Sequence, residues 1–117
     1  MSSIRPTEYN MTIRRNRTFS KEFNFVDSAG AAIDLSLYTI TSEIRKEANY
    51  DSALIDTFNI DMTDAATGTI VLYFSEVETA AIAPTFGFYD ILFDNGTDKE
   101  TWVFGQVEVK ESITNVS

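Results

Sequence analysis

The chain has 117 residues, which suits one domain, and its 44% hydrophobic and 13% aromatic content supplies a core without covalent staples. Cysteine and histidine are absent, which excludes disulfides, thiolate metal sites, and the commonest general base and metal ligand. The net charge of −9 opposes nucleic acid as a partner.

The first half of the chain predicts four strands. Residues 1–7 are expected to form a flexible arm, because Pro6 lacks the N–H that strand pairing needs. Apolar and polar residues then alternate, as in half-buried strands, over four ranges: 8–15, 18–26, 38–46 and 53–60. In the link between the second and third strands, Asp34 is expected to accept hydrogen bonds from nearby backbone groups and not to bind a ligand.

A strand and a short helix are predicted next. The strand covers 69–74, where β-branched and aromatic residues concentrate. Ser75 and Glu78 have the spacing of a capping box, which predicts a helix over 76–82. Its apolar residues Val77 and Ile82 are expected to face the core.

The last part of the chain predicts a β-hairpin over 86–109, because two aromatic-rich runs flank a polar turn with Asn95-Gly96. The first run is apolar on both pleat faces: Phe86, Phe88 and Leu92 lie on one face, and Tyr89, Ile91 and Phe93 on the other. Such a strand is expected inside a sheet, with both faces covered or nearly so. Residues 112–117 are expected to form a flexible tail.

Seven strands, regularly spaced turns and one short helix predict an all-β antiparallel sandwich. We expect one domain over residues 1–117. No apolar run is long enough to span a membrane, and the start lacks the apolar stretch of a signal peptide, so we expect synthesis in the cytoplasm and no membrane partner.

The positive charges are concentrated near the start of the chain. Residues 1–50 carry seven Lys or Arg against six Asp or Glu, whereas residues 51–117 carry two against twelve. Four of the cations form a cluster: Arg14, Arg15, Arg17 and Lys21. The simplest interpretation is that they are solvated positions on the first two strands. The functional alternative is a docking patch for an acidic neighbour, which includes another copy of this chain. Four charges on an acidic domain are too few for nucleic acid.

Two acidic loops are candidates for calcium sites, one with Asp61 and Asp64 and one with Asp94, Asn95 and Asp98. The second lacks the spacing of a calcium-binding EF-hand loop, and side-chain acceptors in turns explain both loops more simply. We therefore predict no metal site and no cofactor.

The carboxylate of Asp90 stands in the most apolar strand. Its simplest interpretation is pairing with an arginine such as Arg45, or hydrogen bonding to the backbone. An enzyme would need Asp90 together with a loop acid, and no spaced catalytic motif is present, so we expect no enzymatic activity.

Exposed aromatic residues could stack on sugars, and Tyr38, Tyr50 and Trp102 are the candidates. Trp102 is most simply a core residue. Tyr50 stands between Asn49 and Asp51 in a predicted loop, so we expect it to be exposed. A carbohydrate-binding module for host-surface attachment is therefore the alternative function.

The chain resembles the small immunoglobulin-like domain at the N-terminus of tailed-phage upper baseplate proteins and related tail or fibre components. The resemblance covers about residues 10–115. It is carried by short segments spread along the chain: Arg17-Thr18-Phe19, Gly30, Ile33-Asp34-Leu35, Tyr38-Thr39-Ile40, Ile44-Arg45, Thr67-Gly68, Ile70-Val71-Leu72, Ser75, Glu78-Thr79, Tyr89-Asp90-Ile91, Gly105-Gln106-Val107-Glu108-Val109 and Ile113-Thr114.

The resemblance implies an immunoglobulin-like sandwich with a structural role in a virion and no catalytic residues. The implied function is an assembly, adaptor or decoration subunit of the tail, baseplate or capsid, located in the virion after synthesis in the host cytoplasm. Its expected partners are other virion proteins and further copies of itself, which it would contact through strand edges and surface patches.

Overall fold

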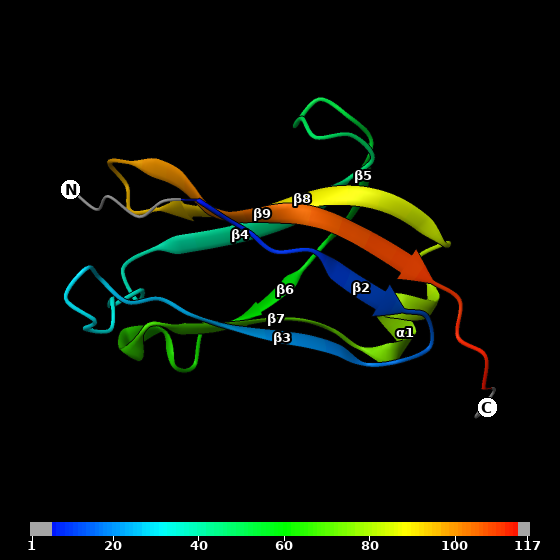
Figure 1. Cartoon of the computed structure of the whole chain (residues 1–117), viewed down its shortest axis with the longest axis horizontal. Helices are drawn as coiled ribbons and strands as arrows, with labels where there is room; N and C mark the ends of the chain where they lie inside the picture. The colour runs from blue at the N-terminus through cyan, green and yellow to red at the C-terminus, as the bar shows by residue number, and fades with distance from the viewer. Residues whose placement is uncertain (1–5, 115–117) are drawn as a thin grey trace.

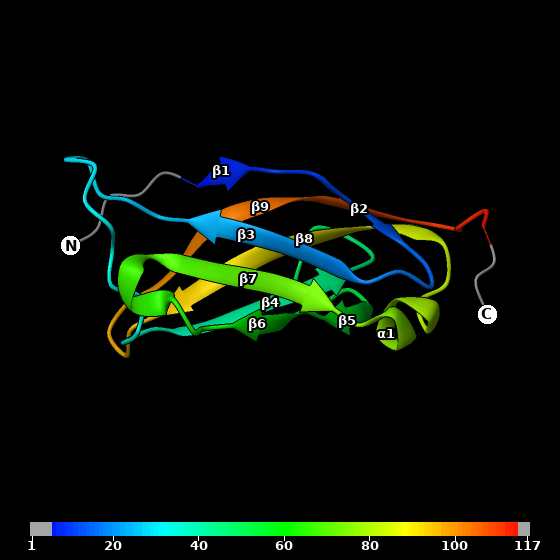
Figure 2. The ribbon, with the colours of Figure 1, turned by 90° about the horizontal axis from the view of Figure 1, so that it is seen from below.

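The computed structural model describes residues 6–114 and shows two β-sheets packed face to face, with one short helix at one end (Figures 1 and 2). The strands are β1 Thr7–Glu8, β2 Met11–Arg14, β3 Phe19–Asn24, β4 Thr39–Arg45, β5 Leu54–Thr57, β6 Asn59–Asp61, β7 Thr69–Phe74, β8 Thr85–Asp94 and β9 Lys99–Lys110. The helices are the 3-10 turn η1 Ala65–Thr67 and the α-helix α1 Glu76–Ala80. The predicted all-β sandwich is confirmed.

The large sheet has the strand order β1-β9-β8-β4-β5, with β2 also on β9, and the small sheet has the order β3-β7-β6. Both β1 and β2 run parallel to β9, whereas the other pairs are antiparallel. A three-stranded sheet facing a larger sheet built around a central hairpin is the arrangement of immunoglobulin-like sandwiches.

The predicted strand over 53–60 is two strands that belong to different sheets. β5 pairs with β4 in the large sheet, and β6 pairs with β7 in the small sheet. Phe58 lies at the crossing and is 4% exposed. The apolar run predicts strand structure, but it does not indicate the switch of sheet at a buried aromatic residue.

The capping box of α1 is present as predicted. The Ser75 hydroxyl accepts a hydrogen bond from the backbone N–H of Glu78, and the Glu78 carboxylate accepts one from the backbone N–H of Ser75. Of the two residues predicted to face the core, Ile82 is buried at 5% exposed, whereas the prediction for Val77 is wrong, because its side chain is 75% exposed. The helix is anchored instead by Thr79, which is fully buried and whose hydroxyl donates to the carbonyl of Arg17 at 2.7 Å.

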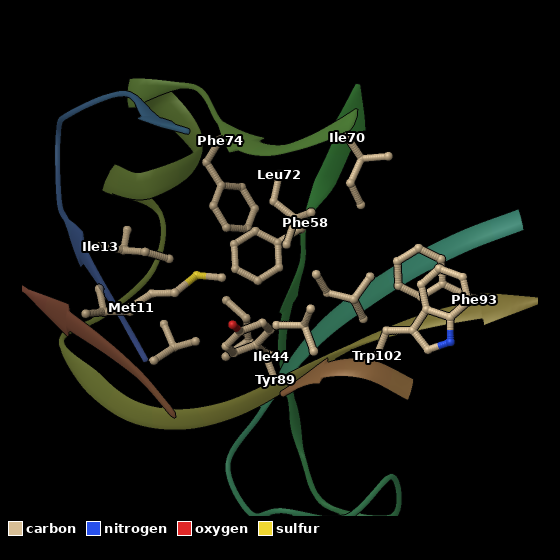
Figure 3. Packing of buried hydrophobic residues seen from close by; sticks show 14 of the residues in the cluster. Met11, Ile13, Ile44, Phe58, Ile70, Leu72, Phe74, Tyr89, Phe93 and Trp102 are labelled. Atoms are coloured by element: carbon tan, nitrogen blue, oxygen red, sulfur yellow. The ribbon is translucent and has the colours of Figure 1, made fainter. Parts of the chain in front are cut away.

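The core lies between the two sheets and is rich in aromatic rings (Figure 3). Trp102 is 1% exposed, which confirms its predicted place in the core. Its ring stacks on Phe93 with centroids 4.1 Å apart, and Tyr38 packs edge-on against it. Leu72 and Phe74 of β7 approach from the small sheet.

The central hairpin forms as predicted, with β8 and β9 paired along their length. The inward face of β8 is buried, as Tyr89, Ile91 and Phe93 are each at most 4% exposed. The expectation that its other face is covered too is wrong. Phe86 is 63% exposed, and within residues 6–114 no helix or strand lies over this side of the large sheet (Figure 1).

The two ends predicted to be flexible extend partly outside the described residues. Of the arm over 1–7, Thr7 pairs with Val103 in β1. Of the tail over 112–117, the hydroxyl of Ser112 donates to the carbonyl of Arg15 at 2.5 Å. Both described parts are therefore bound to the sandwich.

Candidate functional site

The candidate site is the outer face of the large sheet, which points away from the small sheet. Along β8 the outward residues alternate with the core residues and include Phe86, Phe88, Asp90 and Leu92. Phe88 and Leu92 are half-buried, whereas Phe86 is largely exposed. This strand therefore presents apolar side chains and one carboxylate on a face that carries no second layer.

Strand register places charged residues beside an aromatic ring of β9 on the same face. Asp90 pairs with Glu43 of β4 on one side and with Phe104 of β9 on the other. Glu8 of β1 pairs with Phe104 in turn. Directly paired residues project to the same face of a sheet, so three carboxylates and one ring lie in a single row across four strands.

The loop between β4 and β5, residues 46–53, rises from this face (Figure 1), and its residues 47–50 line the same hollow as the row of side chains. Arg45 holds the loop in place, because its Nη1 donates to the carbonyl of Ser52 at 2.7 Å. Nε and Nη2 of Arg45 both donate to Oε1 of Glu43, at 3.2 and 2.8 Å. Arg45 is thus occupied by its own strand and by the loop.

A groove of about 500 Å³ lies between this loop and the strands. It is lined by Glu8, Glu43, Arg45, residues 47–50, residues 88–90 and residues 104–106. Its aromatic lining residues are Tyr50, Phe88, Tyr89 and Phe104, of which Tyr89 is 4% exposed and packs in the core. Its charged residues are four carboxylates, of Glu8, Glu43, Glu47 and Asp90, against the single cation of Arg45. We call it the outer groove.

Asp90 lies at the centre of this row of side chains and has no cation as a partner within residues 6–114. The pairing predicted with Arg45 is wrong, because Arg45 bonds to Glu43, and Asp90 instead accepts a hydrogen bond of 3.3 Å from the Thr101 hydroxyl. Partial loss of solvent raises the pKa of Asp90, the bond from Thr101 lowers it, and the negative charge of Glu43 raises it again, with a net increase. Ionised Asp90 is therefore held in a site that disfavours its charge.

Replacing Asp90 by Asn is expected to raise the melting temperature at pH 7. The folded-state pKa lies above the ordinary value of 3.8, so the stability present when Asp90 is protonated is lost as pH rises through that pKa. Asparagine cannot ionise and keeps an oxygen for Thr101. Thermal unfolding at several pH values should show that the variant's higher melting temperature, relative to the unmodified chain, holds at pH 7 and shrinks towards about pH 4. A lower melting temperature at pH 7 would mean that the carboxylate stabilises the fold.

The four cations of the predicted docking patch do not form one surface free of other contacts. Arg15 donates to Oε2 of Glu111 and to the carbonyl of Ala80, at 2.7 and 2.6 Å. Arg17 donates to the carbonyls of Asn16 and Thr114, and the ammonium of Lys21 lies 4.7 Å from the ring centroid of Tyr9. Arg14 is exposed on β2. Three of the four therefore contact their own chain.

The predicted exposure of Tyr50 is confirmed, since its side chain is 84% exposed at the rim of the outer groove. Tyr38 is half-buried against Phe93 and Trp102, which removes it from the exposed aromatic residues. Of the three aromatic candidates named from the sequence, Tyr50 alone lies at the groove.

The acidic turns serve as backbone acceptors, as the simpler interpretation predicts. Oδ1 of Asp61 accepts the backbone N–H of Thr63 at 2.8 Å, and Oδ1 of Asp94 accepts that of Gly96 at 2.8 Å. Asp34 likewise accepts the backbone N–H of Ser36 at 2.9 Å. Hydrogen bonds from the side chains of Ser36 and Thr63, and then from their backbone N–H groups, lower the pKa of Asp34 and Asp61, respectively. In residues 6–114 no three acidic side chains come close enough together to hold a metal ion.

Sequence reasoning missed the groove, although two of its signals were visible. One was β8 itself, apolar on both faces, and the other was Asp90 within it. The positions of Glu8, Glu43 and Phe104 beside Asp90 depend on strand order and register, which the sequence did not specify. The partners of Asp90 could not be named without them.

Among the described residues, no helix is long and apolar enough to cross a membrane. No protein-family model matches the chain, and no curated protein matches it. Part of the crystal structure of Listeria monocytogenes InlP aligns with 92% of this chain, at 11% identity and a TM-score of 0.49. A family 123 glycoside hydrolase from Clostridium perfringens aligns with 91%, at 11% identity and a TM-score of 0.36. The aligned regions are 28% and 23% of those chains, and at these values neither similarity bears on function.

Proposed function

We propose that this chain is a non-enzymatic structural protein of a phage virion, an assembly, adaptor or decoration subunit that docks onto neighbouring virion proteins or further copies of itself. The observation that carries the proposal is the outer face of the large sheet. Phe86 and Phe104 are 63% and 41% exposed there, beside half-buried Phe88. Contiguous exposed apolar side chains on a small domain mark surfaces that bind other proteins, and aromatic residues are enriched at such interfaces.

Docking by this face is favoured over addition of a strand to a sheet edge. The edge strands β5 and β6 have four and three residues, which gives a partner strand little backbone to pair with. The other edge of the small sheet, β3, carries Lys21 and Glu22, and charged residues on an edge strand oppose pairing. The resemblance of the sequence to phage baseplate domains supports a virion as the setting.

The proposal predicts that the chain is a component of purified particles of the phage that encodes it, detectable by mass spectrometry. A variant with Phe86 and Phe104 both replaced by Ser should fold but be largely lost from the particles, because the docking face loses its exposed rings. The matched control replaces Leu37 by Ser. Leu37 is 83% exposed in the turn before β4, away from Phe86 and Phe104, so this change should leave incorporation unchanged. Thermal unfolding of all three purified proteins checks that each is folded.

Absence of the unmodified chain from the particles would overturn the virion assignment. Normal incorporation of the double variant would show that docking uses a different surface.

Carbohydrate binding at a host surface is the second candidate function. It is favoured by the composition of the outer groove, in which the rings of Tyr50, Phe88 and Phe104 lie near the carboxylates of Glu43 and Asp90. Apolar rings with a few polar groups are typical of small-molecule sites, and such a set can stack on a sugar and accept its hydroxyls. A glycan array that gives no signal with the purified chain would remove this candidate.

A further inference from the structure

We propose that the outer groove receives an arginine or lysine side chain from the protein onto which this chain docks, an inference that rests on the proposed function. The groove would hold the cation between the carboxylate of Asp90 and the rings of Phe88 and Phe104. The carboxylate and both rings are at adjacent positions of β8 and β9 and line the same groove.

The charge of the lining favours a cation. Four carboxylates line the groove against the single guanidinium of Arg45. The guanidinium of Arg45 donates through Nε and Nη2 to Glu43 and through Nη1 to the carbonyl of Ser52. Its charge therefore offsets Glu43 and leaves Glu8, Glu47 and Asp90 to attract a positive group from outside. Electrostatic complementarity of this kind selects between partners as well as strengthening binding.

Asp90 is the acceptor best placed for the incoming group. Its bond from Thr101 is long, at 3.3 Å, and engages Oδ2. An ionised carboxylate in a partly desolvated site gains most from a charge-assisted hydrogen bond, because the low dielectric strengthens the attraction and a cation removes the cost of the isolated charge. The raised pKa of Asp90 agrees with this geometry.

The rings supply the second part of the site. A guanidinium or ammonium over an aromatic face is attracted by the ring quadrupole, and the attraction grows when the pair is shielded from water. The chain uses the same contact elsewhere, where the ammonium of Lys21 lies 4.7 Å from the ring centroid of Tyr9 and 5.7 Å from that of Phe23. In the outer groove Arg45 is the cross-strand partner of Phe88, but its guanidinium donates to Glu43 and Ser52, which leaves the Asp90 carboxylate without a cationic partner within residues 6–114.

The test is a titration of ¹⁵N-labelled protein at low salt with the peptide acetyl-Gly-Arg-Gly-amide. The same peptide with citrulline, the neutral isostere of arginine, is the reference. We expect amide shifts at Phe88, Asp90 and Phe104, with the arginine peptide binding about fivefold more tightly than the citrulline peptide. Replacing Asp90 by Asn should weaken binding of the arginine peptide about threefold. Replacing Asp51 by Asn, in the loop between β4 and β5 but outside the groove lining, should not.

Equal binding of the two peptides, or no shift at the groove, would overturn the inference. So would shifts at these amides with oligosaccharides in place of the arginine peptide. The two proposals fail separately. If particles exclude the Phe86/Phe104 double variant but the peptide does not bind, the docking face stands and its partner is not cationic at this groove. If the peptide binds but the chain is absent from particles, the groove stands and the virion assignment fails.

Discussion

Replacing Trp102 by Ala is expected to lower the free energy of unfolding by about 3–5 kcal/mol, because it deletes a large buried ring and leaves a cavity that the surrounding rings cannot fill. The indole is 1% exposed and stacks on Phe93, while Phe25 and Tyr38 lie with ring centroids 5.6 and 5.5 Å away. A domain of this size has a total stability of about 5–15 kcal/mol, so the variant should be close to unfolding. Urea unfolding followed by far-UV circular dichroism measures this free energy. Tryptophan fluorescence cannot be used, because Trp102 is the only tryptophan and the variant lacks it.

Two further variants calibrate this result. Trp102→Phe keeps a ring in the stack and should lose less than Trp102→Ala. Tyr50→Ala removes an aromatic side chain that is 84% exposed and should change stability by less than about 0.5 kcal/mol. A loss at Trp102 no larger than that at Tyr50 would contradict the proposed place of the indole at the centre of the core.

The fold was largely predictable because local patterns determine most of it. Alternation over 8–15 predicts that Tyr9, Met11 and Ile13 share one buried face, and this is confirmed for Met11 and Ile13, which are at most 6% exposed, but not for Tyr9, which is 39% exposed. The capping box placed the start of α1. Prediction failed where a contact distant in sequence decides the outcome. Phe58 is buried between two strands of different sheets, and Thr79 replaces Val77 as the anchor of α1 because its hydroxyl meets the carbonyl of Arg17.

The candidate site was less predictable, because it is made by register and not by spacing along the chain. Glu43, Asp90 and Phe104 are far apart in sequence and become neighbours through the pairing of β4, β8 and β9. The sequence did indicate that the outer side of β8 needs a cover. Within residues 6–114 no helix or strand supplies one, and this mismatch between pattern and structure is the basis of our proposal that a partner binds there.

Replacing Gly105 by Ala is expected to cost about 2–3 kcal/mol, because overpacking against rigid backbone cannot be relieved by a side-chain rotation. A Cβ atom at this position would lie 2.1 Å from the carbonyl oxygen of Tyr9 and 2.9 Å from Oδ1 of Asn10. That carbonyl accepts the phenolic hydroxyl of Tyr89 at 2.6 Å, and Oδ1 of Asn10 accepts the backbone N–H of Gln106 at 2.9 Å. The added methyl group must therefore push Tyr9 and Asn10, which connect β1 to β2, away from β9.

A double-mutant cycle with Tyr89→Phe distinguishes this mechanism from a general loss of packing. In the unmodified chain, removing the hydroxyl of Tyr89 should cost about 1 kcal/mol, because the carbonyl of Tyr9 loses its donor. In the Gly105→Ala background the same change should cost close to nothing, since the carbonyl has already moved. Additive losses would mean that the segment stays in place. Because Glu8 immediately precedes Tyr9, its displacement would also carry one carboxylate out of the outer groove, so Gly105→Ala should weaken the arginine peptide even where the protein remains folded.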